Sequence, residues 1–183
     1  YTEFFAEPEN IAELLECLKW VKFNNLKYRV IGAGSNLLIK NTFHQGLTIC
    51  TRKLTKIEIN KFSGLVEAEC GVMLPAIANL LAQNGCEGGE WLIGIPGTIG
   101  GAVFMNAGSG RVWISKYLLS VQVFDTKNLS IYKLNKEDLI FKYRFSSFQT
   151  NKFTIIKANF KFKPNKNIKK ITDKTKQNLK NKT

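Results

Sequence analysis

The run that most constrains this chain extends from Gly94 to Gly108 (GIPGTIGGAVFMNAG). Five glycines and a proline stand there among apolar residues such as Ile99, Val103, Phe104 and Met105, and no charge interrupts them. A glycine-rich linker is normally polar, so this pattern predicts irregular backbone that is buried. Glycine lets backbone N–H groups approach a phosphate or a flat ring closely. A tight structural crossover between strands is the alternative interpretation.

Length and composition indicate a globular protein. The chain has 183 residues, enough for one or two domains, with 44% hydrophobic and 22% charged residues. No stretch is long and apolar enough for a membrane span, and the start resembles no signal peptide, so we expect a cytoplasmic protein without a membrane partner. The chain begins at Tyr1 rather than Met, which suggests a fragment.

The residues that often bind metals are scattered along the chain. His44 is the only histidine and has no clustered partners, so we predict no metal site. The cysteines form no CxxC pair, which favours free thiols in a reducing compartment. They are Cys17, Cys50, Cys70 and Cys86.

The net charge of +13 is concentrated at the end of the chain. Residues 163–183 contain eight lysines and one aspartate, and so carry more than half of the excess. This segment has no aromatic residue that could stack on a base, which argues against a nucleic-acid partner. A moderately basic remainder still suits small anionic molecules that carry phosphates.

Apolar periodicity predicts mixed helices and strands. A helix should open at Pro8 and end near Asn24, with Ile11, Leu14 and Leu18 on one face. Helical spacing recurs in the tail from Ile168 onward. Because the strands do not alternate regularly with helices, the fold class is α+β. The other expected elements are strands at 28–31, 47–50, 56–59, 65–69, 118–125, 129–134 and 153–162, and a helix at 74–83.

A second glycine motif follows the expected strand at 28–31. Gly32-Ala33-Gly34-Ser35-Asn36 has two of the glycines of a dinucleotide fingerprint, but the third is missing because position 37 is Leu. No amphipathic helix follows it, so a Rossmann interpretation fails. The turn could still offer several hydrogen-bond donors to a phosphate, and a plain turn is the alternative.

Three motifs in this order resemble the UDP-N-acetylenolpyruvoylglucosamine reductase family: residues 31–39, residues 94–108 and Tyr143-Arg144-Phe145-Ser146. The resemblance implies a two-subdomain FAD-binding fold of the vanillyl-alcohol-oxidase/PCMH type. Subdomain 1 would span 1–53 and subdomain 2 would span 54–163. The basic segment 164–183 would begin a substrate domain that is mostly missing.

The resemblance also assigns cofactor-binding residues. Those that would hold the FAD pyrophosphate are Gly32, Gly34, Ser35, Asn36 and Leu37. Those that would line the ribityl chain and isoalloxazine are Gly71, Ile95, Pro96, Gly97, Thr98, Gly100, Gly101 and Asn106. Both glycine runs can present backbone donors without Cβ atoms in the way, which agrees with this assignment.

In the family, NADPH reduces the flavin, which then delivers hydride to the enolpyruvyl group of a UDP-sugar in peptidoglycan synthesis. Arg144 matches the family arginine that would stabilise the carboxylate or enolate, with Tyr143 and Ser146 as supporting substrate-binding residues.

The family's proton-donating serine, its C-terminal glutamate and its opening Thr-Thr-x-x-x-Gly-Gly segment have no match here. Ser146 matches a different motif and is not that proton donor. We therefore expect an FAD-binding part that is inactive in full turnover. The alternatives are another FAD oxidoreductase of the superfamily, such as a small-alcohol oxidase or a molybdenum-hydroxylase flavin subunit, and a non-enzymatic basic module that binds nucleic acid.

Overall fold

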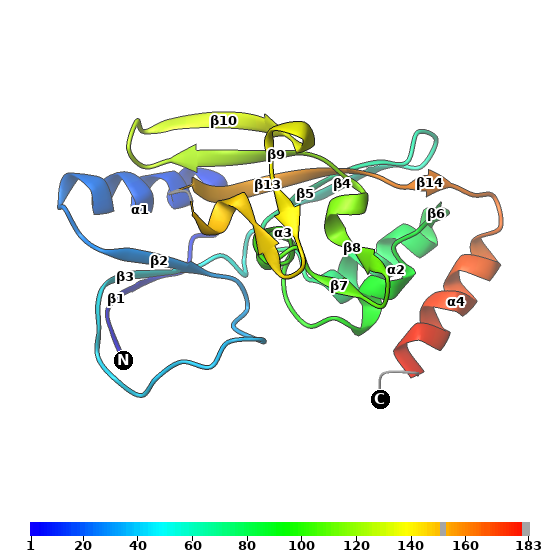
Figure 1. The fold of residues 1–183 in the computed structure, drawn as a ribbon, viewed down its shortest axis with the longest axis horizontal. Coiled ribbons are helices and arrows are strands. Elements are labelled where there is room, and N and C mark those ends of the chain that lie inside the picture. The colour runs from blue at the N-terminus through cyan, green and yellow to red at the C-terminus, as the bar shows by residue number, and fades with distance from the viewer. Residues whose placement is uncertain (151–152, 181–183) are drawn as a thin grey trace.

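A computed structural model describes residues 1–150 and 153–180 of the chain. Its two main sheets lie side by side, a small one at the lower left of Figure 1 and a large one across the top. The sheets fall on either side of the predicted boundary between residues 53 and 54, while the domain limits themselves stay predictions. Residues 181–183 of the predicted basic segment lie outside the described residues.

The small sheet is parallel and has the order β1 (Thr2–Ala6), β3 (His44–Cys50), β2 (Tyr28–Ile31). Strand β1 was not predicted, because its five residues are mostly exposed and show no apolar alternation. As predicted, the segment after β2 forms no helix. Figure 1 shows it as a long loop that extends away from the rest of the chain before it returns to β3.

Helix α1 (Ile11–Phe23) connects β1 to β2. The prediction that it opens at Pro8 is wrong, because Asn10 is the N-cap and its side chain accepts a hydrogen bond from Glu13 N at 3.0 Å. The predicted end is confirmed, since Asn24 is the C-cap. The buried face carries Leu14, Leu18 and Val21.

The large sheet is antiparallel. Its order is β10 (Ser130–Asn135), β9 (Leu118–Asp125), β13 (Phe153–Lys161), β5 (Leu65–Glu69), β4 (Ile57–Asn60). The predicted β4–β5 hairpin is confirmed, with Ile57 opposite Ala68. Strand β13 lies in the centre and pairs with both β9 and β5. The prediction of an α+β fold is therefore confirmed.

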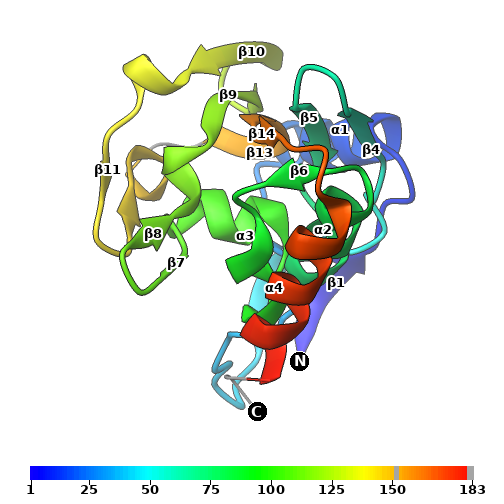
Figure 2. The ribbon, with the colours of Figure 1, turned by 90° about the vertical axis from the view of Figure 1, so that its right-hand side faces the viewer.

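Helices pack against this sheet and against one another. Helix α2 (Leu74–Gln83) buries the face that the sequence predicted. The tail forms α4 (Ile168–Lys180), which packs on α2 and on the short 3-10 helix η1 (Glu90–Gly94) (Figure 2). The helix buries Ile171 and Thr175 and leaves the apolar Leu179 exposed.

The run from Gly94 to Gly108 is only partly irregular. Its middle forms helix α3 (Ile99–Phe104), which corrects the prediction of irregular backbone throughout. Ile99 and Val103 are buried as expected, but Phe104 and Met105 are 39% and 40% exposed. The helix forms because the Thr98 side chain caps it and because Gly100 N donates to Cys70 O.

Short elements complete the described chain. They are β6 (Cys86–Glu87) with β14 (Lys163–Pro164), β7 (Gly108–Ser109) with β8 (Val112–Trp113), β11 (Phe141–Lys142) with β12 (Phe145–Ser146), and the 3-10 helices η2 (Ile114–Lys116), η3 (Lys136–Asp138) and η4 (Ser147–Gln149). None of the helices within 1–150 and 153–180 has the length and apolar character needed to cross a membrane.

Candidate cofactor-binding cleft

A cleft of about 1040 Å³ lies between the two sheets. Its walls are strand β2 and the loop that follows it, the segment 95–101, the Arg144 hairpin and the start of β13. The cleft therefore brings together all three motifs that the sequence singled out. Its volume matches the upper range of pockets that enclose a whole cofactor-sized molecule.

The loop 32–36 forms one end of the cleft. The N–H groups of residues 33–36 donate to no other residue in the described part of the chain. Gly34 has a φ of +71°, a left-handed conformation that lets successive N–H groups point the same way. The loop thus presents unpaired donors of the kind that bind phosphate oxygens.

The two glycine motifs lie against each other. A Cβ added to Gly32 would lie 3.0 Å from Thr98 Cγ2 and closer still to Thr98 Oγ1. A Cβ added to Gly97 would lie 4.0 Å from Ser35 Oγ. The absence of a side chain at Gly32 therefore permits the close approach that joins the two walls of the cleft, whereas a methyl group at Gly97 would meet Ser35 only at ordinary contact distance.

Two predicted flavin-lining residues, Gly71 and Asn106, are not among the residues that line the cleft. A Cβ at Gly71 would meet the carbonyl oxygen of Leu54 at 2.6 Å and that of Thr51 even closer, so this glycine permits tight backbone packing. Asn106 is 4% exposed, and its Nδ2 donates to Lys142 O at 2.9 Å. Gly71 nevertheless adjoins the cleft, because its neighbours Cys70 and Thr51 both line it.

Arg144 lies on the cleft wall at the turn between β11 and β12. Its φ is +53°, and its guanidinium carbon lies 5.7 Å from the centre of the Tyr143 ring. No carboxylate within the described ranges pairs with it. The guanidinium is therefore available to an anionic ligand.

A hydrogen-bond network holds the Arg144 turn on the end of α3. Ser146 is fully buried, and its Oγ donates to Phe104 O at 2.6 Å. Gln149 Nε2 donates to both Phe104 O and Arg144 O at 3.1 Å. The structure thus brings Arg144 to the cleft, whereas the buried Ser146 and the largely exposed Tyr143 are not among the residues that line it.

The sequence reasoning missed Gln149, which lines the cleft, and also missed Tyr28 and Thr154. Gln149 follows the Tyr-Arg-x-Ser motif by three residues, and this proximity was the one available signal. Nothing in the local sequence marks the other two, which reach the cleft through the packing of the two sheets.

The electrostatics of the cleft favour an anion. Lys27, Arg29 and Arg144 line it, and its described lining includes no aspartate or glutamate. Cys70 also lines the cleft, and burial raises the pKa of its thiol to about 12, so it contributes no negative charge at neutral pH. An extended ligand with phosphate groups fits this charge pattern.

The fold and the cleft together define an α+β protein with a cleft suited to an extended anionic cofactor. Residues 2–131 match the family model described as the FAD binding domain, and the chain belongs to this family. The fold is the two-subdomain FAD-binding fold that the sequence predicted.

Relatives and solved structures agree with this assignment. The chain is 51% identical over 183 residues to a UDP-N-acetylenolpyruvoylglucosamine reductase of Prochlorococcus marinus subsp. pastoris, covering 100% of this chain and 62% of the relative. A reductase of the same name from Prochlorococcus marinus MIT 9313 is 38% identical over 99% of this chain and 59% of its own length. The chain spans about three fifths of these relatives.

The crystal structure of UDP-N-acetylenolpyruvylglucosamine reductase (MurB) from Thermus caldophilus superposes with a TM-score of 0.76 at 26% identity, covering 97% of this chain and 60% of the other. An alkyldihydroxyacetonephosphate synthase gives a TM-score of 0.65 at 15% identity, over 87% of this chain and 31% of the other, which shows the fold alone. The resemblance found in the sequence is confirmed.

Proposed function

We propose that this chain binds FAD in the cleft as part of a UDP-N-acetylenolpyruvoylglucosamine reductase, an enzyme of peptidoglycan synthesis. The reaction would reduce the enolpyruvyl group of a UDP-N-acetylglucosamine derivative to give UDP-N-acetylmuramate, with NADPH as the reductant. The observation that carries the proposal is that one cleft joins both glycine motifs and Arg144. The names of the relatives give independent support.

The residues present fit FAD. The unpaired N–H groups of residues 33–36, with the side chains of Ser35 and Asn36, would hold the pyrophosphate. The predicted residues that line the cleft and would contact the flavin end are Ile95, Pro96, Gly97, Thr98, Gly100 and Gly101. Gly71 and Asn106 would contribute by shaping the neighbouring backbone, because Gly71 packs against the carbonyl groups of Thr51 and Leu54 and Asn106 donates to Lys142 O.

When bound and reduced, FAD supplies the hydride for the enolpyruvyl double bond. Arg144 would bind the substrate carboxylate and stabilise the negative charge that develops beside it, because its guanidinium is a fixed fork of donors. Ser146 and Gln149 would keep the Arg144 turn in place through Phe104 O. Tyr143, stacked beside the guanidinium, would contribute to the substrate edge of the site.

The reduced product also needs a proton at the carbon that carries the carboxylate. Ser146 is a poor donor for this step, since its hydroxyl is buried and donates to Phe104 O. We therefore expect these 183 residues, expressed alone, to bind FAD and to lack full turnover.

The first test is the absorbance of the purified chain. We expect a yellow protein with a flavin spectrum, or a colourless protein that takes up added FAD. Failure to bind added FAD would contradict the proposal. A single, slow reoxidation of the reduced, FAD-loaded chain by the enolpyruvyl UDP-sugar would separate this activity from that of other FAD oxidoreductases. Repeated turnover at a normal rate would contradict the expected lack of full turnover.

A further inference from the structure

The short segment 51–54, here called the crossing linker, carries the chain from the small sheet to the large one. It leaves β3 at Cys50 and turns where Leu54 N donates to Thr51 O at 3.0 Å. Leu54 is fully buried, and Gly71 packs against the carbonyl groups of this turn. The crossing linker therefore fits tightly against subdomain 2.

The same segment holds the strand end from which the 32–36 loop begins. Thr51 N donates to Ile31 O at 2.9 Å, and Thr51 Oγ1 donates to the same oxygen at 3.2 Å. The Cys50 thiol donates to Gly32 O at 3.3 Å. Any displacement of the crossing linker would thus move the backbone at Ile31 and Gly32.

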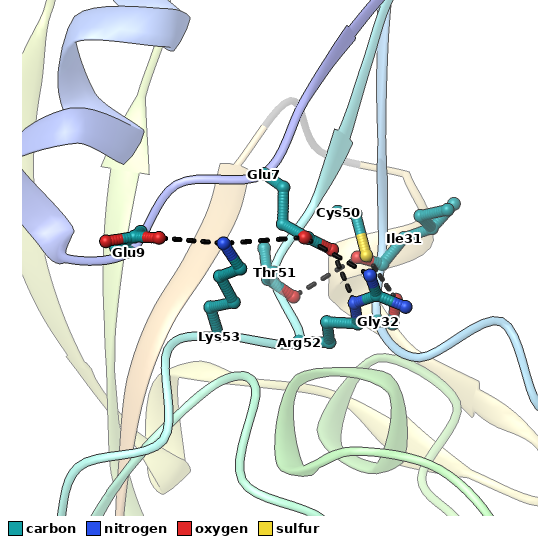
Figure 3. Close-up of polar contacts among 8 residues, drawn as sticks. All are labelled: Glu7, Glu9, Ile31, Gly32, Cys50, Thr51, Arg52 and Lys53. Atoms are coloured by element: carbon teal, nitrogen blue, oxygen red, sulfur yellow. Dashed lines mark hydrogen bonds and ion pairs between the residues drawn. The ribbon is translucent and has the colours of Figure 1, made fainter.

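Two acidic residues ahead of α1 clamp the crossing linker from outside (Figure 3). Glu7 accepts from Arg52 Nη2 at 3.2 Å, and its other oxygen pairs with Arg52 Nε. Lys53 Nζ lies 2.7 Å from Glu9 Oε1 and 3.7 Å from Glu7 Oε2. Arg52 therefore makes a two-point contact with Glu7, whereas Lys53 bridges both carboxylates.

The Glu7–Arg52 pair is better placed than an ordinary surface ion pair. The Glu7 side chain is only 17% exposed, although Arg52 reaches solvent with 61% of its side chain. The hydrogen bond from Arg52 lowers the pKa of Glu7, so the carboxylate is charged at neutral pH. Two-point arginine contacts fix geometry as well as charge.

We propose that Glu7 and Arg52 are positioning residues of the cofactor cleft, which hold the crossing linker so that the loop 32–36 keeps its spacing from Thr98. The inference rests on the proposed binding of FAD. Neither side chain lines the cleft, so their effect passes through the hydrogen bonds of Cys50 and Thr51.

The spacing between the loop 32–36 and Thr98 matters because the two segments are already in close contact. Gly32 lies against the buried Thr98, while the loop beyond it has few contacts of its own. If the loop is released so that only about one tenth of the molecules keep the competent arrangement, the apparent Kd for FAD rises about tenfold.

The test compares Glu7→Ala, Arg52→Met and the double variant with wild type. A matched control is Glu67→Ala, which breaks the 2.7 Å Glu67–Lys157 pair on a part of the large sheet that does not line the cleft. The Kd for FAD is measured by quenching of flavin fluorescence, and the stability of the apoprotein by urea unfolding. Arg52→Lys, which keeps the charge and loses the two-point contact, serves if a larger change prevents folding.

We expect each single variant to raise the Kd about tenfold, the double variant to add little more, and Arg52→Lys to fall between, while the control stays within about twofold of wild type. Equal affinities in wild type and the clamp variants overturn the inference and leave FAD binding intact. The inference also fails if the control loses as much affinity as they do, since that effect is general destabilisation. Absence of FAD binding by wild type overturns the proposed function itself and, with it, this inference.

Discussion

Gly32 offers the sharpest test of how the cleft is built, because the substitution Gly32→Ala adds one methyl group at the contact between the two glycine motifs. That Cβ would lie 3.0 Å from Thr98 Cγ2 and closer to Oγ1, where ordinary contacts begin near 3.4 Å. Thr98 is 2% exposed and caps α3 through Gly101 N, so it has little room to retreat. The loop 32–36 must therefore move by at least several tenths of an ångström.

Such a displacement stretches the donor distances to a bound phosphate beyond the range of good hydrogen bonds. Loss of one charge-assisted hydrogen bond costs about 1.5 to 3 kcal/mol, which raises the Kd for FAD by about 10- to 150-fold. Overpacking lowers the unfolding free energy of the apoprotein by about 1 to 3 kcal/mol. Fluorescence titration with FAD and urea unfolding measure the two effects separately.

A second substitution checks the cause. Thr98→Ala removes the atoms nearest the new methyl group, so Gly32→Ala combined with Thr98→Ala should lose less than the sum of the two single changes. Thr98→Ala alone costs about 1 kcal/mol because it removes a helix cap. If Gly32→Ala binds FAD within about twofold of wild type, the close approach of the two walls does not shape the cofactor site.

Three further predictions follow from the cleft. Gly34→Ala and Gly110→Ala each place a side chain in open space at a left-handed φ, which is +71° at Gly34 and +61° at Gly110. Both substitutions should therefore lower the unfolding free energy, measured with urea, by a similar ~1–2 kcal/mol. Only Gly34→Ala should also weaken FAD binding in a titration. Arg144→Met should leave the Kd for FAD within about twofold and abolish the slow reoxidation of the reduced flavin by the enolpyruvyl UDP-sugar, with Arg144→Lys intermediate. Because the pKa of Cys70 is about 12 in the folded state, stability to urea should decrease as pH rises above about 8.5, where the unfolded thiol ionises, and Cys70→Ala should remove this part of the decrease.

Helices and strands that bury one face were predicted from the sequence. The alternation of apolar and charged residues around Ile57 and Val66 predicted the β4–β5 hairpin, because side chains on a strand alternate between its two faces. The apolar face of α2 was predicted for the corresponding reason at helical spacing. In contrast, α3 was missed because its glycines disfavour a helix, and the interactions that stabilise it come from Thr98 and from the distant Cys70.

The sequence predicted the motifs of the candidate site but not the long-range contacts that hold them in place. Glycines after a strand indicated the 32–36 loop, because that conformation is encoded locally. The packing of Gly71 under the crossing linker and the bond from Asn106 to Lys142 O depend on residues far apart in the chain. The Glu7–Arg52 contact is equally long-range, which is why charge patterning alone gave no sign of it.

The central place of β13 has a consequence for how the chain is made. Strands β9 and β5 each leave one edge open until residues 153–161 have been synthesised and inserted between them. The match to the family model ends at residue 131, within β10, so a shorter piece cut there would carry the glycine motifs but would lack β13 and most of β10. Such a piece would leave one edge of β5 and both edges of β9 largely unpaired beside buried valines such as Val66 and Val121. The large sheet is therefore completed late in synthesis, when β13 inserts between β9 and β5. Until then, the ribosome-bound chain has unpaired strand edges that need protection from aggregation.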